Sequence, residues 1–389
     1  MRAWGRAAAA ALGLAWAAAG SSALAAATFV VGPQGMPMAL QDAVQLAQDG
    51  DTIELLSGEY RSTLLVEGRR LTLRGVGGKT PVIDGEAKVR EAKALWTLRG
   101  GAITLDNLEF RGARSSDGGG AGVRQEGGSL TVTRCAFYDN EYGLQATNVE
   151  SAELRISGSV FGAAPKVVGG LYHLLNVGRI GKLEITGSRF QQGFEGHLIK
   201  SRAKETLIAY NFIHDGVRGR ASYEIELANA GLATVIGNVI AQGTEAGNRV
   251  LVAYGSEGRA WDKNELYVAH NTFINYGWSP AWFLRVFTDR LPGQVQVHAI
   301  NNLLVGPGLF WPAVTGHLEG NRHATGGMLR DIWTYGLELP AGSVWRGSGV
   351  DPHDINGHDL TPAGEFEWPA NVRALAPGRS QWSPGAFQR

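Results

Sequence analysis

Short runs in which apolar and polar residues alternate recur along most of the chain, and glycine-rich turns separate them. Alternation with a period of two is typical of β-strands that bury one face. Many runs are followed by Ser, Asn or Cys, one further residue, and then Phe, Ile or Leu. These apolar positions are Phe110, Phe137, Phe161, Phe190, Ile213, Ile240, Phe273 and Leu303. Because they recur every 23 to 33 residues, the pattern predicts stacked repeat units.

Each repeat holds two or three short strands and no helical segment of matching period. This predicts an all-β fold, a right-handed parallel β-helix in which equivalent residues lie about 4.8 Å apart on neighbouring coils. The apolar column then forms the core. Asparagine stands two positions before the apolar residue in four consecutive repeats, at Asn211, Asn238, Asn271 and Asn301. We expect these side chains to form a buried ladder, with Cys135 as a small buried thiol in the same column.

The two ends of the chain depart from the repeat. Residues 40–48 have apolar positions at helical spacing before the first strand, which predicts a helix that covers the open end of the first coil. The repeat fades near residue 305, and residues 310–389 are rich in Pro, Gly and Trp. We therefore expect a β-helix with its cap over residues 26–309 and an irregular tail, 310–389, docked on its exterior.

Residues 1–25 have the features of a secretory signal peptide. Arg2 and Arg6 precede an apolar run at 7–19, and small residues follow at 23–27. That run is shorter than the about 20 residues of a membrane span, and no later segment is apolar enough to span. The sequence predicts an exported protein, periplasmic or extracellular, without a membrane span in the mature chain.

The composition adds two constraints. The formal net charge is zero, which gives no reason to expect nucleic acid as a partner. Cys135 is the single cysteine, so no intramolecular disulfide can form despite the oxidising destination.

Polar residues gather on the second strand of the middle repeats. In register, these strands form one sheet whose outward side chains line a groove, and a groove of this kind suits an extended polymer such as a glycan. The candidate residues for this outward face are His173, Asn176, His197, Lys200, Glu224, Glu226, Tyr254 and Arg285. Of these, His173, Tyr254 and Arg285 are candidates for substrate binding.

The chemistry of this face is that of proton transfer or cation binding. Glu224 and Glu226 are two residues apart and are expected on one side of the strand, where they can hold a cation or act as acid and base around a sugar bond. A lysine beside a carboxylate, here Lys200, can take a proton, and Arg202 can stabilise negative charge. Each residue also has a structural interpretation: a solvated strand face for the carboxylates, a salt bridge for Lys200, and a packing role for His173 and His197.

The stretch Glu195-x-x-x-x-Lys200-Ser201, followed by Thr206 and Asn211-x-Ile213, resembles the core motif of polysaccharide lyase family six, the chondroitinase B and alginate lyases. The resemblance implies a right-handed parallel β-helix that removes the C5 proton of a uronic acid. By position Lys200 matches the base, and Glu195 and Asn176 match calcium ligands. The Arg that the family places on the next coil has no counterpart in residues 227–230.

A second resemblance lies in the tail. Asp351-Pro-His-Asp354 matches the DPHD motif of alginate C5-epimerases, which share this fold, but it stands outside the repeats. A tail folded back over the groove would bring His353 to the site.

The sequence thus favours an exported protein that acts on an acidic polysaccharide, with β-elimination at a uronic acid as the leading hypothesis. In it Lys200 or His197 removes the proton. Arg202, or calcium held by Glu195, Glu224 or Glu226, stabilises the charge. The alternatives are a non-catalytic glycan-binding or envelope-structural β-helix, a C5-epimerase, and a glycoside hydrolase that uses the two glutamates.

Overall fold

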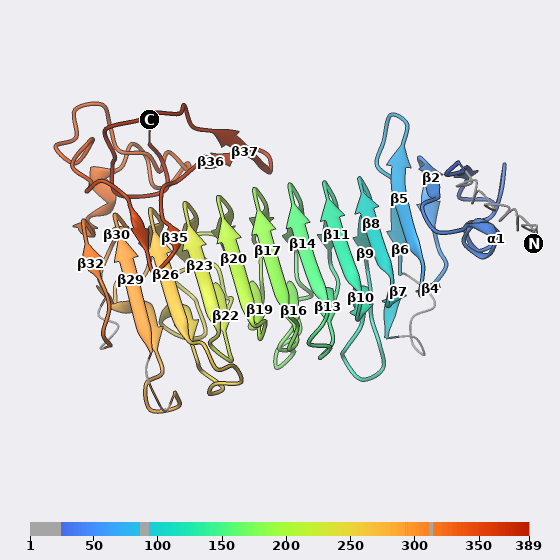
Figure 1. Ribbon diagram of the computed structural model, residues 1–389, viewed down its shortest axis with the longest axis horizontal. Coiled ribbons are helices and arrows are strands. Elements are labelled where there is room, and N and C mark those ends of the chain that lie inside the picture. Colours follow the sequence, from blue (N-terminus) through green and yellow to red (C-terminus); the bar gives the residue numbers. More distant parts are fainter. Residues whose placement is uncertain (1–24, 86–92, 292, 294, 311–313, 389) are drawn as a thin grey trace, which may run out of the picture.

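The computed structural model describes residues 25–85, 93–291, 293, 295–310 and 314–388. Nearly all of this chain winds into coils whose strands stack in three long parallel sheets (Figure 1). In this described part, none of the helices combines the length and apolar character that a membrane crossing requires. The predicted signal peptide, residues 1–25, falls outside the described residues except for its last position.

From β2 to β33, successive strands along the chain belong to the three sheets in turn. The 12-stranded sheet contains β1 (Thr28–Val31), β2 (Thr52–Leu56), β5 (Arg70–Val76), β8 (Ala102–Asp106), β11 (Ser129–Thr133), β14 (Glu153–Ser157), β17 (Lys182–Thr186), β20 (Glu205–Ala209), β23 (Leu232–Ile236), β26 (Glu265–Ala269), β29 (Gln296–Ile300) and β32 (Leu318–Glu319). The 10-stranded sheet contains β4 (Leu64–Glu67), β7 (Ala94–Arg99), β10 (Ala121–Glu126), β13 (Tyr142–Ala146), β16 (Leu175–Val177), β19 (Ile199–Ser201), β22 (Ile225–Leu227), β25 (Val250–Tyr254), β28 (Ala281–Val286) and β31 (Gly308–Phe310). The 11-stranded sheet contains β3 (Glu59–Tyr60), β6 (Val82–Asp84), β9 (Glu109–Arg111), β12 (Ala136–Tyr138), β15 (Val160–Gly162), β18 (Arg189–Phe190), β21 (Phe212–His214), β24 (Val239–Gln242), β27 (Thr272–Asn275), β30 (Leu303–Val305) and β33 (Arg322–Ala324). The predicted right-handed parallel β-helix is confirmed.

The predicted apolar column lies in the core, and its aromatic members stack face to face. Ring centroids are 5.3 Å apart for Phe110 and Phe137, 4.5 Å for Phe137 and Phe161, and 4.7 Å for Phe161 and Phe190. The register continues the column through Ile213, Ile240 and Phe273. The last predicted member is wrong by one residue, because Phe273 pairs with Leu304 and not with Leu303.

The buried asparagine ladder is present with the same one-residue shift at its end. The backbone N–H of Asn211 donates to Asn238 Oδ1, that of Asn238 to Asn271 Oδ1, and that of Asn271 to Asn302 Oδ1, at 2.9 to 3.0 Å. The amide nitrogens donate to carbonyls of neighbouring coils, as Asn238 Nδ2 does to Ile208 O at 2.8 Å. Asn301, predicted for this ladder, instead bonds to Val350 of the tail.

Cys135 belongs to the same column nearer the N-terminus, as predicted. Its backbone N–H donates to Ser159 Oγ, and its thiol is buried. Burial raises the pKa of this thiol to about 12, which leaves it protonated and unreactive.

The N-terminal helix is shorter than the predicted segment. Helix α1 (Leu40–Leu46) buries Leu40 and Ala43, and it lies at the N-terminal end of the solenoid (Figure 1). Its buried residues join the main core, together with Val31 and Ile53 of the first strands. The helix thus covers apolar side chains that the first coil leaves open.

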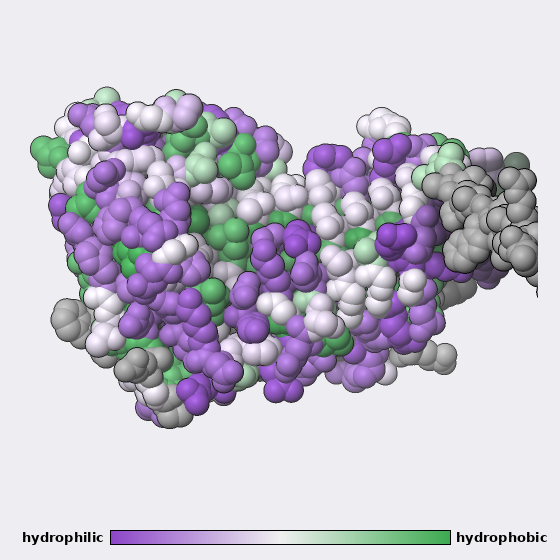
Figure 2. Space-filling view, in the orientation of Figure 1, coloured by the Kyte–Doolittle hydropathy of each residue, from purple (hydrophilic) through white to green (hydrophobic). Residues whose placement is uncertain are grey.

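The tail begins later than predicted and packs on the exterior. Strands β31, β32 and β33 add a further coil after residue 309, so the solenoid runs to Ala324. Beyond it come the 3₁₀ turn η1 (Gly326–Met328) and two antiparallel hairpins, β34–β35 (Asp354–Ile355, His358–Asp359) and β36–β37 (Gly364–Glu367, Asn371–Ala374). The tail rises above the C-terminal half of the solenoid, and the β36–β37 hairpin forms its overhanging edge (Figures 1 and 2).

The asparagine ladder gives a stability prediction. Asn238→Ala leaves the buried N–H of Asn211 and the carbonyl of Ile208 without these partners, at a cost of about 1–3 kcal/mol for each unsatisfied group. We expect the free energy of unfolding, measured by urea denaturation, to fall by at least about 2 kcal/mol. The exposed Asn371→Ala is the matched control and is expected to change it by less than about 0.5 kcal/mol. Equal effects of the two substitutions would contradict a structural role for the ladder.

Candidate functional site

The middle of the 10-stranded sheet presents an outward column of polar side chains. Lys200 of β19 pairs in register with Asn176 of β16 on one side and with Glu226 of β22 on the other. The column continues past Ala253 to Arg285, and in the opposite direction it reaches Gln145. Parallel stacking therefore brings residues two dozen positions apart into direct contact.

Lys200 lies between two carboxylates. Its Nζ is 2.8 Å from Glu226 Oε2 and 2.8 Å from Glu257 Oε1. Arg202 forms a two-point contact with the same Glu257, with Nε 2.6 Å from Oε2 and Nη2 2.8 Å from Oε1. We call Lys200, His197, Arg202, Glu226 and Glu257 the Lys200 cluster.

The two carboxylates of the cluster differ in their exposure to solvent. Glu226 has a side chain only 4% exposed, and it accepts a hydrogen bond of 2.6 Å from Ser256 Oγ. Glu257 follows β25 in a turn, and its side chain is 36% exposed. Glu226 is therefore enclosed in the sheet, whereas Glu257 is partly open to solvent.

Histidine side chains stack along the edge of the column. The rings of His173 and His197 have centroids 4.5 Å apart, and Tyr223 continues the stack at 4.8 Å. The backbone N–H of His197 donates to His173 Nδ1, and that of Tyr223 donates to His197 Nδ1 at 3.3 Å. In a neutral His197 the proton is thus on Nε2, which lies 3.2 Å from Glu226 Oε2.

The electrostatics of the site favour ionised carboxylates and a neutral His173. Burial opposes ionisation of Glu226, but His197, Lys200 and Ser256 more than offset it and lower its pKa. Glu257 has a lowered pKa for the same reason, since Arg202 and Lys200 outweigh its partial burial. Burial, reinforced by the neighbouring His197 and by the charge of Lys200, holds the pKa of His173 well below its ordinary value.

Four predicted catalytic residues, His197, Lys200, Arg202 and Glu226, thus lie in one cluster. The candidates for substrate binding lie at different places around it. His173 stacks under His197, and Arg285 is exposed in the column of Lys200, with its guanidinium 4.5 Å from the ring of Phe287.

Glu224 does not share the face of Glu226, so this expectation is wrong. It precedes the first residue of β22, at the position that Leu174 and Leu198 occupy in the two previous coils, and its side chain is fully buried. Gln242 Nε2 donates to it at 3.3 Å. Burial, together with the nearby Asp215, raises its pKa well above the ordinary value, so Glu224 is protonated in the interior.

Tyr254 is also turned inward, which corrects its predicted outward orientation. It pairs with Leu227, one residue beyond Glu226, and strand alternation sends both side chains to the core. Its hydroxyl donates to the carbonyl of Gly231.

The residues that resemble calcium ligands are separated in the fold. Glu195 lies in the turn before β19, where one oxygen is 3.1 Å from Arg220 Nη2 and the other accepts the Gly169 N–H. Asn176 has a buried Oδ1 that makes no hydrogen bond with the described residues. In the described part of the chain, no group of three or more His, Cys, Asp or Glu side chains can hold a metal ion. Calcium binding by Glu195 and Asn176 stays a prediction from the resemblance, and no step is derived through calcium.

The DPHD segment is far from this cluster along the fold. His353 lies against His317, with ring centroids 5.5 Å apart, and Asp354 belongs to a hairpin whose His358 packs on Tyr267 of the 12-stranded sheet. The tail therefore delivers His353 to a different sheet from the one that carries Lys200.

Sequence reasoning missed Glu257 and Ser256. Both follow the last residue of β25, where alternation no longer predicts the direction of a side chain. One sequence feature could have indicated Glu257. It is an acidic residue between Gly255 and Gly258, in the turn after the strand two coils beyond Lys200.

The lowered pKa of Glu226 predicts acid-dependent stability. Unfolded Glu226 binds its proton near the ordinary pKa of 4.5, whereas the folded protein binds it only at lower pH. Below about pH 5 the unfolded state binds more protons, so the free energy of unfolding falls as pH falls. Glu226→Gln is expected to show a shallower acid slope than the wild type in urea denaturation, and the exposed Glu205→Gln the wild-type slope. Parallel curves for wild type and Glu226→Gln would contradict this assignment.

Solved structures with the same architecture are known. The chain is similar to the crystal structure of pectate lyase Pel9A, with a TM-score of 0.65 and 14% identity over 94% of this chain and 98% of that one. An alginate lyase from Paenibacillus sp. str. FPU-7 has a TM-score of 0.46 and 14% identity over 76% of this chain and 99% of that one, a likeness too weak to carry an argument. No protein-family model and no curated protein matches the sequence. At these identities the likeness shows a shared right-handed parallel β-helix and no more.

Proposed function

We propose that this chain is an exported enzyme that acts on an acidic polysaccharide, by β-elimination at a uronic acid. The observation that carries the proposal is the Lys200 cluster itself. It places Lys200, Arg202 and His197 beside two carboxylates on the outward face of a parallel β-helix sheet. The likeness to pectate lyase Pel9A supports a carbohydrate substrate, and residues 1–25 support export.

Binding starts with an exchange of carboxylates. A uronate carboxylate offers Arg202 the same two-point geometry that Glu257 now supplies. Glu257 is exposed in a turn and can be displaced, whereas Glu226 remains held by Ser256. In this proposal Glu257 keeps the cationic pair in place until substrate arrives, and Arg202 then neutralises the substrate carboxylate.

The elimination step then uses groups beside that carboxylate. As a neutral amine, Lys200 takes the C5 proton; the C5–H electron pair forms the C4–C5 double bond, and the C4–O bond breaks. The Lys200 ammonium formed in this way passes the proton to the leaving oxygen, and the enolate-like charge on the substrate carboxylate is stabilised by Arg202. The displacement of Glu257 also removes one of the two carboxylates that pair with the Lys200 ammonium.

The geometry favours Lys200 over His197 as the base. His197 Nδ1 already accepts the N–H of Tyr223, so the neutral ring carries its proton on Nε2 toward Glu226 and has no free lone pair. His197 is then a positioning residue that holds Glu226, and His173 fixes His197 from below.

The proposal predicts formation of an unsaturated uronate. With polygalacturonate, alginate or chondroitin, each with and without calcium, the wild type is expected to raise the ultraviolet absorbance of the 4,5-unsaturated product on at least one polymer. Lys200→Ala removes the base and is expected to lower the rate by about 10²- to 10⁴-fold. Lys182→Ala, a lysine paired with Glu184 on the 12-stranded sheet, is the matched control and should retain the wild-type rate.

Three results would assign the groove to another activity. New reducing ends without absorbance would indicate hydrolysis. Solvent deuterium incorporated into the polymer without cleavage would indicate C5-epimerisation. Glycan retention without any turnover, unchanged by Lys200→Ala and Glu226→Ala, would indicate a binding or envelope-structural module.

A further inference from the structure

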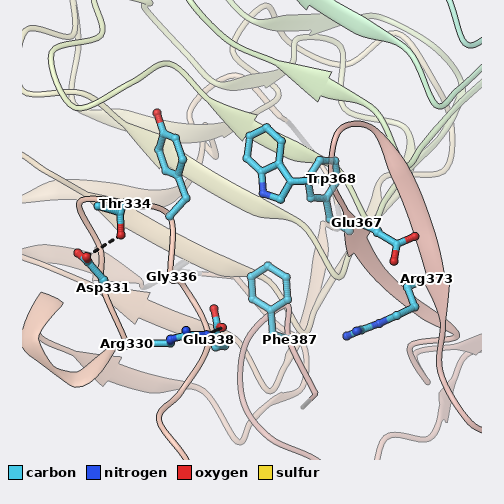
Figure 3. A pocket seen from close by; sticks show the side chains of 11 residues that line it. Arg330, Asp331, Thr334, Gly336, Glu338, Glu367, Trp368, Arg373 and Phe387 are labelled. Carbon is cyan, nitrogen blue, oxygen red and sulfur yellow. Dashed lines mark hydrogen bonds and ion pairs between the residues drawn. The ribbon is translucent and has the colours of Figure 1, made fainter.

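The tail and the 11-stranded sheet enclose two cavities that share Tyr335. The first, of about 920 Å³, lies within the tail and is lined by Trp368, Phe387 and several charged residues (Figure 3). The second, of about 710 Å³, lies where the coils turn from the 11-stranded to the 10-stranded sheet, and Tyr335 lines it together with Gln191, His214 and Arg218. We call the two cavities together the Tyr335 trough.

Exposed aromatic rings form the part of the trough in the tail. Trp368 is 47% exposed and Tyr335 42% exposed, and their rings are nearly parallel, at an interplanar angle of 28° with centroids 6.0 Å apart. Trp368 is held from the solenoid side by Phe212 at 5.0 Å and by the Arg189 guanidinium at 5.1 Å. Aromatic surface that is fixed in orientation and left open to solvent marks a binding site more often than a structural one.

The arginines near this aromatic surface pair with glutamates, whereas Asp331 and Glu367 accept hydrogen bonds from neutral groups. Arg330 lies 2.9 Å from Glu338, and Arg373 pairs with Glu365. Figure 3 shows Arg330 and Glu338 beside Phe387. Asp331 accepts the hydroxyl of Thr334 at 2.6 Å. This end of the trough therefore offers ring faces and two carboxylates that can accept hydroxyl groups, which suits the uncharged body of a sugar ring.

The other end of the trough is basic. Lys166, Arg218 and Arg220 line it, against the carboxyl groups of Glu245 and Asp215. The side chain of Arg218 is 84% exposed, and its Nε lies 2.7 Å from Glu245 Oε1. Arg220 lies over the ring of Phe194, with its guanidinium 4.6 Å from the centroid. Basic groups are thus presented to solvent on a preformed surface.

Asp215 does little to cancel this positive charge. Its carboxyl group is buried under the turn, where it accepts the backbone N–H groups of Gly193 and Ala221. Burial raises its pKa to about 7, so the group is partly protonated near neutral pH. Arg220 also lies 3.1 Å from Glu195, so the charge at this end is that of three basic side chains against the carboxylates of Glu245 and Glu195.

We propose that the Tyr335 trough is a second binding site for an acidic oligosaccharide. Sugar rings pack on Trp368 and Tyr335, and a carboxylate or sulfate of the same chain pairs with Arg218 and Arg220. The trough lies along β18 and β21 of the 11-stranded sheet, whereas the Lys200 cluster lies on β19 and β22 of the 10-stranded sheet. The site binds polymer without taking part in bond cleavage, and it does not require the groove to be catalytic.

The test measures binding in the full chain with the groove inactivated. Affinity electrophoresis of Lys200→Ala through gels that contain polygalacturonate or alginate is expected to show retardation, and a gel with neutral dextran none. Adding Trp368→Ala or Arg218→Ala is expected to weaken the retardation at least about tenfold, because each removes a contact in the trough. Adding Trp278→Ala, an almost fully exposed tryptophan of another cavity, should leave it unchanged.

Arg218→Ala keeps the test valid if Trp368→Ala disturbs the tail. The Arg218 side chain is too exposed to support the fold, so its thermal unfolding midpoint should match that of the parent. Retardation that persists in Arg218→Ala and Trp368→Ala would overturn the proposal, as would equal retardation in dextran. A dimer in sedimentation that Trp368→Ala dissociates, without glycan retention, would assign the surface to a second copy of the chain and also overturn it.

Discussion

The structure depends on one constraint, the register of successive coils about 4.8 Å apart. Every strand must pair with the equivalent strand before and after it, so each position along a coil becomes a column along the solenoid. The stacked rings from Phe110 to Phe190 and the asparagines from Asn211 to Asn302 are such columns. A one-residue slip would turn every core side chain to the outside, and this fixes the outward column as firmly as the inward ones.

That constraint explains how a cluster of charged residues can form in a chain with a formal net charge of zero. Lys200 and Glu226 meet because their strands are neighbours, and Arg202 meets Glu257 across two coils. Ion pairs taken out of water stabilise little by themselves, since the loss of hydration offsets most of the attraction. The proposed binding of charged ligands rests on their position on an outward strand face, with one carboxylate buried and one exposed. The Tyr335 trough also combines residues that are distant in the sequence. There the tail packs against the coils, and residues of both line the surface.

The columns of the β-helix could be predicted from the sequence because they repeat. The apolar residues, the asparagine ladder and the contact between Lys200 and Glu226 follow from strand alternation and repeat spacing, whereas the spacing left open which of His197 and Lys200 faces outward. The errors fall where alternation stops. The predictions of Leu303 for the apolar column and Asn301 for the ladder were each wrong by one residue, because the spacing changes near the last coil. Asn301 instead bonds to the tail. Glu224 stands just before its strand, at a position filled by leucine in earlier coils, and Glu257 stands in a turn just after one. The packing of the tail had no repeat to indicate it, so Tyr335 and Trp368 could not be placed.

The most direct measurement of the central claim is a crystal structure of the Lys200→Ala variant with a bound uronate oligosaccharide. The account predicts that the sugar lies along the 10-stranded sheet, that one of its carboxylates contacts Arg202, and that Glu257 has moved out of that contact while Glu226 stays against Ser256. An oligosaccharide bound elsewhere on the solenoid, with Glu257 still paired to Arg202, would contradict it.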